Sequence, residues 1–110
     1  ITFGPVTHDA ALIDPICNGS IARYHHGKTD ALLFTNAAST RREDVSIKLS
    51  YDQGRTWPVS RTIYPGPSAY STVIQLKDGT IGVLYERGET SSTERMTFAR
   101  FNLAWITAVH

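Results

Sequence analysis

The stretch SYDQGRTW, residues 50–57, contains a carboxylate that could act as an acid or a base, Asp52. Such a group can exchange a proton with a substrate, but in a tight turn it can instead accept hydrogen bonds from backbone N–H groups. Gly54 favours the turn, because glycine tolerates a positive φ that other residues resist. Trp57 can fold back over the turn, with its N–H as a polar group. We interpret Asp52 as a turn residue and not as a catalytic acid.

Tyr70 is a second candidate, at the entrance of a strand-like run that follows the segment YPGPS, residues 64–68. Ligands often bind at the ends of strands. A phenol there could act on a ligand. An aromatic residue in this position can equally pack at the rim or in the core. Taken alone, the position favours packing.

Four further residues suggest chemistry that the sequence does not support. His25 and His26 lie in a loop without Cys or carboxylates at ligand spacing, so we expect no metal. Cys17 is the only cysteine, so no internal disulfide can form, and we interpret it as a small buried residue. Asn18 begins an N-glycosylation pattern that we expect to be unused, because it lies where the first strand of the expected fold begins.

The composition describes an ordinary globular chain. Of 110 residues, 41% are hydrophobic and 19% charged, and the net charge is +1. Disorder is therefore not expected, and neither is a general attraction to nucleic acid or membranes. No apolar run approaches the roughly 18 residues of a membrane helix. The N-terminus carries neither a signal peptide pattern nor a Met, which suggests a start inside a longer protein.

Short, β-rich runs separated by turns must position these residues. The runs predict an all-β, antiparallel fold. Lys77-Asp78-Gly79 is a strong hairpin signal. The tail LAWITAVH fits either a helical turn or a short strand. The seven expected strands are Ser20–Tyr24, Ala31–Thr35, Val45–Ser50, Val59–Tyr64, Tyr70–Leu76, Thr80–Tyr85 and Arg95–Phe101.

The chain also contains an internal repeat. IARYHHGKTDALLF is echoed by TVIQLKDGTIGVLY, and Ser20 and Ser71 are offset by 71 − 20 = 51 residues. A period near this length predicts the blades of a β-propeller. One four-stranded blade would span about 16–66. A second would span about 67–106, with its outer strand supplied from outside. A propeller needs roughly four to eight blades, so we expect the rest to come from the same or another chain.

The pattern formed by Ser50, Asp52, Gly54, Thr56 and Trp57 matches the Asp box, a structural motif on the blades of sialidases and several unrelated proteins. Four longer pieces resemble the C-terminal part of the catalytic domain of a sialidase (exo-α-neuraminidase). They are LIDPICNGSIARY, LLFTNAASTRREDVSIKLSYDQGRTWP, YPGPSAYSTVIQLKDGTIGVLYE and MTFARFNLAWI. The resemblance implies a six-bladed propeller, of which this chain holds about the last two blades.

The resemblance also implies site residues. Tyr70 matches the catalytic nucleophile, and a neutral phenol is not repelled by the carboxylate that sialic acid carries. It needs a base, which in the family is a glutamate on an earlier blade. Arg42, and not the adjacent Arg41, matches one of three arginines that grip that carboxylate bidentately. Glu86 matches a glutamate that orients another arginine. Without the resemblance, Arg42 and Glu86 would read as solvated charges.

The resemblance therefore implies a retaining exo-sialidase. It would release terminal α-linked sialic acid from glycoproteins, glycolipids and oligosaccharides without a metal or another cofactor. The segment alone is expected to be inactive, because the acid, the base and two arginines are missing. Two alternatives stay open: a non-catalytic Asp-box propeller that binds glycans or acts as a scaffold, and a trans-sialidase. The resemblance favours a secreted, periplasmic or lysosomal location over a cytoplasmic one.

Overall fold

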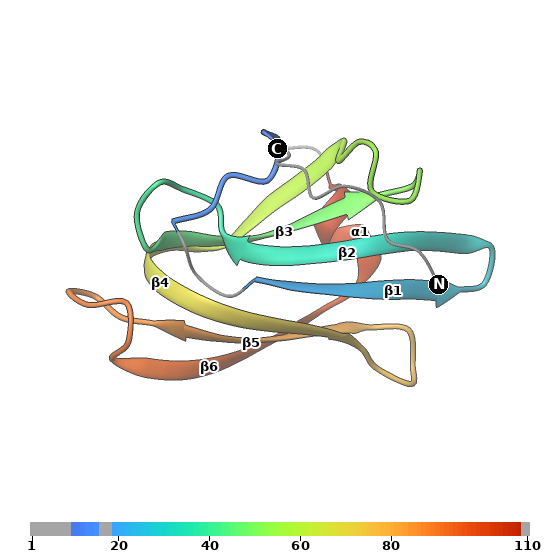
Figure 1. The fold of residues 1–110 in the computed structure, drawn as a ribbon. Coiled ribbons are helices and arrows are strands. Elements are labelled where there is room, and N and C mark those ends of the chain that lie inside the picture. Colours follow the sequence, from blue (N-terminus) through green and yellow to red (C-terminus); the bar gives the residue numbers. More distant parts are fainter. Residues whose placement is uncertain (1–9, 16–18, 109–110) are drawn as a thin grey trace, which may run out of the picture.

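The computed structural model describes residues 10–15 and 19–108 of the chain. They form β1 (Ser20–His26), β2 (Thr29–Ala37), β3 (Glu43–Ser50), β4 (Val59–Gln75), β5 (Ile81–Arg87), β6 (Arg95–Phe101) and α1 (Leu103–Thr107). The strands make one antiparallel sheet in which sequence neighbours pair, in the order β1-β2-β3-β4-β5-β6 (Figure 1). The all-β prediction is confirmed.

Strand β4 differs from the prediction, because one continuous strand replaces the two that were expected. Its residues up to Pro67 pair with β3, and its residues from Ser68 onward pair with β5. Pro65 and Pro67 lie at this change of partner. Proline has no N–H, so a strand can leave one neighbour and join another there without leaving a donor unpaired. The Pro-Gly-Pro run that suggested a break thus marks a change of partner.

The sheet curves into a half-barrel, and its hydrophobic core lies on the inner side of the curve (Figure 1). Alternate residues along each strand point inward, as the period of a pleated strand requires. Full burial of one such aliphatic side chain stabilises the fold by about 1.5–3 kcal/mol. The fully or almost fully buried aliphatic residues of the strands are Leu33, Val45, Ile47, Leu49, Val73, Ile81 and Val83.

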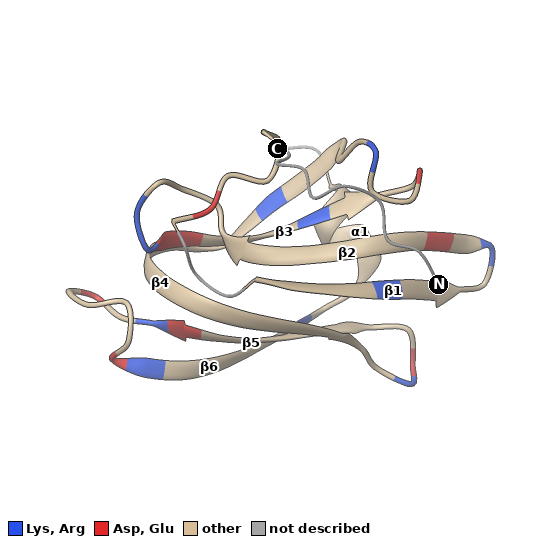
Figure 2. Ribbon diagram, in the orientation of Figure 1, with Lys and Arg blue, Asp and Glu red and all other residues tan. Residues whose placement is uncertain are grey.

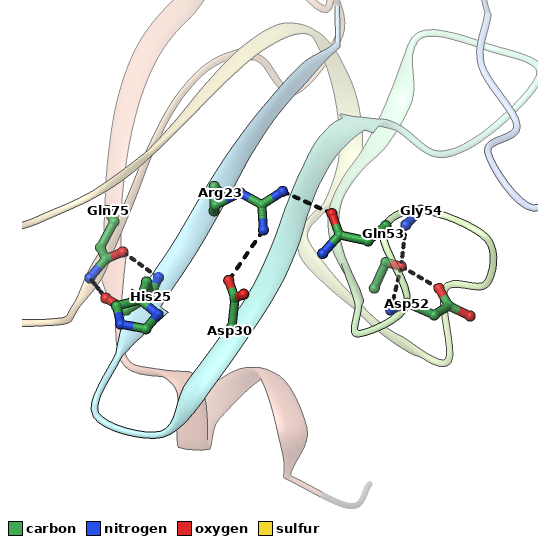
Figure 3. Close-up of polar contacts among 8 residues, drawn as sticks. Arg23, His25, Asp30, Asp52, Gln53, Gly54 and Gln75 are labelled. Carbon is green, nitrogen blue, oxygen red and sulfur yellow. Dashed lines mark hydrogen bonds and ion pairs between the residues drawn. The ribbon is translucent and has the colours of Figure 1, made fainter. Parts of the chain in front are cut away.

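Hydrogen bonds from side chains join β1 to the second half of β4, although the two strands are not paired in the sheet. Gln75 Oε1 accepts from the His25 N–H at 2.8 Å, and Gln75 Nε2 donates to the His25 carbonyl at 2.8 Å (Figure 3). Farther along, Ser20 Oγ accepts from the Val73 N–H at 3.1 Å. The Gln75 amide thus makes the pair of hydrogen bonds that a backbone residue would make in a sheet. It joins β1 to the second half of β4, the two strands that we expected to come first in each blade.

Two hairpin turns in the structure use glycine with positive φ. Gly27 between β1 and β2 has φ 60°, and Gly79 between β4 and β5 has φ 85°. At the second turn, Asp78 Oδ1 accepts from the Thr80 N–H at 3.1 Å. The buried Tyr24 hydroxyl donates to the Gly79 carbonyl at 2.8 Å, and burial raises the pKa of Tyr24. The turn predicted from Asp-Gly is present, and it contacts the edge strand β1.

The C-terminal tail, left open by the sequence, forms the short helix α1. The Asn102 side chain caps it by accepting from the Trp105 N–H at 2.9 Å. The Arg61 guanidinium carbon lies 3.7 Å from the centre of the Trp105 ring, and its Nη1 donates to the Trp105 carbonyl. Ile106 is buried in the core. These contacts fix α1 against the first half of β4.

Charge is spread over the molecule. Figure 2 shows Lys and Arg interspersed with Asp and Glu over the loops and strands, in keeping with the net charge of +1. Among residues 10–15 and 19–108, no helix has the length and apolar character needed to cross a membrane.

Candidate functional site

The structure brings together the three residues that sequence analysis selected for chemistry. Arg42 lies in the loop before β3, Tyr70 on β4 and Glu86 on β5. The Arg42 guanidinium carbon is 5.5 Å from the centre of the Tyr70 ring. Glu86 Oε1 accepts a hydrogen bond from the Tyr70 N–H at 3.3 Å. A cation, a phenol and a carboxylate from three parts of the chain therefore lie at one place.

Tyr70 presents its side chain to solvent. It is 44% exposed, whereas the flanking Ala69 and Ser71 are buried. The register between β4 and β5 shifts between Ser68 and Ser71, so Tyr70 lies in an irregular part of the ladder. Such irregularities recur beside functional sites, where they redirect a side chain. The phenol is thus held on a buried strand and stays accessible to a ligand.

Arg42 is the arginine that lies over the Tyr70 ring in the described part of the chain. Its side chain is exposed and its carbonyl accepts from the Ser68 N–H at 3.0 Å. The neighbouring Arg41 is also exposed, and its backbone N–H donates to Ser39 Oγ at 3.2 Å. An exposed guanidinium keeps its planar set of donors free for a carboxylate. The geometry therefore distinguishes Arg42 from Arg41 as the partner of Tyr70.

Glu86 is half-buried near the end of β5, where it pairs with Met96 of β6. Its carboxylate bonds to the backbone of Tyr70, a contact that the sequence did not predict. The next residue, Arg87, packs over the Tyr64 ring at 5.1 Å and donates to Thr97 Oγ1 at 2.7 Å. Arg87 is thus held by its own neighbours, and Glu86 is left facing the Tyr70 strand.

Sequence analysis did not select Ser68, which bonds to the backbone at Arg42 and at Val45. It is 0% exposed. Its N–H donates to the Arg42 carbonyl, and its Oγ accepts from the Val45 N–H at 2.9 Å. The sequence shows only a serine two positions before Tyr70, which by itself does not distinguish Ser68 from other serines.

The Asp box forms a closed hydrogen-bonded turn at the end of β3 (Figure 3). Asp52 Oδ1 accepts from the Thr56 N–H at 2.8 Å, and Oδ2 accepts from Thr56 Oγ1 at 2.6 Å. Ser50 Oγ accepts from the Gly54 N–H at 2.8 Å and donates to Asp52 Oδ1 at 2.8 Å. The hydrogen bonds from Thr56, then that from Ser50, lower the pKa of Asp52 to about 2. A carboxyl group held so firmly ionised is a poor proton donor.

Gly54 and Trp57 complete this turn. Gly54 has φ 89°, in the region that glycine tolerates. The Trp57 ring lies 5.8 Å from that of Phe34 and is tilted by 57°. Its buried Nε1–H has no hydrogen-bond acceptor within the described residues. The expected use of this N–H as a polar group is therefore not observed there. Trp57 acts as an apolar cover.

Other expectations concern ligands and modification. Cys17 and Asn18 lie outside the described residues. Across the described ranges, no cluster of three or more His, Cys, Asp or Glu side chains is arranged to bind a metal. His25 uses its backbone to bind Gln75 (Figure 3).

The curved sheet is that of a segment of a sialidase-type β-propeller, as solved structures show. The Hadza microbial sialidase Hz136 matches with a TM-score of 0.79 and 35% identity, over 94% of this chain and 20% of that one. The intramolecular trans-sialidase from Ruminococcus gnavus matches with a TM-score of 0.67 and 20% identity, over 84% of this chain and 23% of that one. The latter likeness concerns the fold alone.

Sequence relatives agree with this class. The chain is 45% identical over 112 residues to a sialidase of Micromonospora viridifaciens, a match that covers 96% of the chain. It is 33% identical over 119 residues to an exo-alpha-sialidase of Arthroderma benhamiae, with 94% of the chain covered. No family model matches. The resemblance to sialidases predicted from the sequence is confirmed, and the chain is a segment of a sialidase domain. It spans only 16% of the first relative and 29% of the second.

Proposed function

We propose that the parent protein is a retaining exo-sialidase that cleaves terminal α-linked sialic acid from glycans through a tyrosyl intermediate. One observation carries the proposal. Arg42, Tyr70 and Glu86 meet at the same place, with the Arg42 guanidinium carbon 5.5 Å from the centre of the Tyr70 ring. A carboxylate held by that guanidinium would bring the attached anomeric carbon close to the phenol. A scaffold has no need for this arrangement.

In this reaction the Tyr70 oxygen forms a bond to the anomeric carbon while the bond to the leaving oxygen breaks. The phenol proton passes to a base, and the leaving oxygen takes a proton from an acid. We assign both groups to the remainder of the domain. Water then attacks the anomeric carbon while the bond to the Tyr70 oxygen breaks, which releases sialic acid. The water gives one proton to the deprotonated acid, and the base returns its proton to the Tyr70 oxygen. Because two displacements occur at one carbon, the configuration is retained. Arg42 orients the substrate in both steps.

The remainder of the propeller is the first partner that we propose. The outward face of β4, β5 and β6 carries large apolar side chains that are about half exposed. They are Ile74 at 46%, Leu84 at 42%, Phe98 at 53% and Met96 at 61%. Leu84 and Phe98 are direct cross-strand partners, so the face is continuous. A contiguous apolar face of this kind fits another blade packed against it. The segment alone should be inactive, because the acid and the base are assigned to that remainder.

The test is release of a fluorescent aglycone from an α-sialoside by the complete parent protein. We expect Tyr70→Phe to lower kcat by several orders of magnitude, because the phenyl ring keeps its shape but loses the nucleophile. Tyr51→Phe is the control, since Tyr51 is a 51% exposed tyrosine in the Asp box turn. A parent that binds sialic acid without turnover between pH 4 and 8 would support a glycan-binding propeller instead. Transfer to a sugar acceptor in the product mixture would indicate a trans-sialidase.

A further inference from the structure

We propose that Ser68 is a positioning residue that fixes the backbone of Arg42 relative to that of Tyr70. The inference rests on the proposed function, in which these two side chains act on one substrate. Ser68 would touch no substrate. It would act through the two segments that it holds together.

The contacts of Ser68 reach both sides of the Arg42 corner. Its N–H donates to the Arg42 carbonyl at 3.0 Å, and its Oγ accepts from the Val45 N–H at 2.9 Å. The residue is 0% exposed. Because Ser68 is buried, water cannot replace its hydroxyl as the acceptor for the Val45 N–H. One residue therefore holds the corner from Arg42 to Val45 against β4.

The corner needs this support because the sheet is irregular there. Asp44 has φ 60°, an uncommon conformation for a residue other than glycine. The register of β3 against β4 shifts between Glu43 and Val45, and again between Val45 and Ser46. In such an irregularity the ladder leaves a backbone donor without its usual partner. The Ser68 hydroxyl takes the place of that partner for Val45.

The ladder on the other side of Ser68 is irregular as well. Ser68 pairs with Arg87, and the next pair is Ser71 with Tyr85. Tyr70 lies between these pairs, so its position depends on where Ser68 is held. Two irregular segments that carry the proposed substrate-binding and nucleophilic side chains are thus joined at one buried residue. A displacement of about 1 Å between such groups can cost about a hundredfold in rate.

The experiment replaces Ser68 by Ala in the complete parent protein. We expect kcat/KM to fall about ten- to hundredfold. KM should rise because Arg42 is displaced from the substrate carboxylate, and kcat should fall because Tyr70 is displaced from the anomeric carbon. Ser50→Ala is the matched control. Ser50 is also 0% exposed and also accepts a backbone N–H, from Gly54 at 2.8 Å, but it lies in the Asp box. It should lower the melting temperature and leave both kinetic constants nearly unchanged.

A double-mutant cycle with Arg42→Ala gives the second readout. If Ser68 acts through Arg42, Ser68→Ala should cost much less in the Arg42→Ala background than in the parent. Equal losses in both backgrounds, or a loss no greater than that of Ser50→Ala, would overturn the inference. Should Ser68→Ala fail to fold, Ser68→Cys serves instead, because a thiol keeps the shape and accepts hydrogen bonds only weakly.

The same variants separate this inference from the proposed function. If Tyr70→Phe is inactive and Ser68→Ala resembles Ser50→Ala, the function stands and the positioning role is wrong. Binding of free sialic acid, measured by calorimetry, needs no turnover and should also weaken about tenfold or more in Ser68→Ala. An active Tyr70→Phe variant would refute the nucleophile, whereas weakened binding in Ser68→Ala would still support the positioning of Arg42.

Discussion

Glu86 and Tyr70 are joined by a hydrogen bond from the Tyr70 backbone N–H to the Glu86 carboxylate, 3.3 Å long. The contact gives Glu86 a role within this chain, besides the proposed orientation of an arginine elsewhere in the domain. An amide oxygen can accept the same bond, but it carries no charge. The substitutions Glu86→Gln and Glu86→Ala therefore separate the two roles.

We expect Glu86→Ala to lower kcat/KM by about a hundredfold and Glu86→Gln by about tenfold, because Gln keeps the bond to Tyr70. The measurement is steady-state kinetics of the parent protein on an α-sialoside. Glu89→Gln, in the exposed loop between β5 and β6, is the control. Equal losses for Gln and Ala would mean that only the negative charge of Glu86 matters.

The Asp box should make stability depend on pH in acid. Hydrogen bonds, first from Thr56 and then from Ser50, hold the pKa of Asp52 at about 2, against about 3.9 for an unfolded aspartate. A lowered folded pKa stabilises the fold above the unfolded pKa, and this contribution is lost as pH falls from about 4 to 2. Asp52 is solvent-accessible, so the effect is reduced by screening.

This prediction is checked by the melting temperature of the parent between pH 6 and 2. Asp52→Asn should lower it near neutral pH and flatten its fall in acid. Asp78 and Glu94, whose pKa values are also lowered to about 2, should keep part of the acid dependence in that variant. Asp30→Asn, which breaks an exposed ion pair with Arg23, should change the profile little. An unchanged slope in Asp52→Asn would contradict the prediction.

Gln75 should stabilise the joint between β1 and β4. Gln75→Ala removes two hydrogen bonds to the His25 backbone, at about 0.5–1.5 kcal/mol each. Gln75→Glu should be no better, because a carboxylate can accept from the His25 N–H but faces its carbonyl as a second acceptor. Chemical denaturation of the parent protein measures both. A Glu variant as stable as the parent would show that the bond to the His25 carbonyl contributes nothing.

The two hairpin glycines should respond differently to alanine. Both have positive φ, which costs a side chain about 1–2 kcal/mol. A Cβ on Gly27 would meet nothing within 4 Å, whereas one on Gly79 would lie 2.6 Å from the His26 ring. We expect Gly79→Ala to destabilise the parent by about 1 kcal/mol more than Gly27→Ala, as overpacking does. The difference should disappear in a His26→Ala background, and its persistence there would rule out the ring contact as its cause.

The regular strands could be predicted because their side chains alternate. Leu33, Ile47 and Val83 are buried at positions that the period of two requires. The continuity of β4 could not, since Pro65 and Pro67 are usually signs of a break. The five residues of α1 are too few to show a helical period.

The candidate site divides in the same way. Arg42, Tyr70 and Glu86 were found through resemblance, because composition and spacing alone favoured solvated or packed side chains. Ser68 was missed because its partners depend on the irregular registers of β3 and β4, which a linear sequence does not display. The bond from Glu86 to the Tyr70 backbone was missed for the same reason.

The single strand β4, which pairs with β3 at one end and with β5 at the other, has a consequence for how the molecule opens. The two halves share this strand and one hydrophobic core, so the loss of either half removes packing from the other. The two halves should therefore behave as one cooperative unit, and not as two independently fraying modules. In the parent protein, the slowest amide hydrogens of β2 and β5 should exchange with solvent through a shared opening event. A destabilising substitution in either half should then accelerate exchange in both.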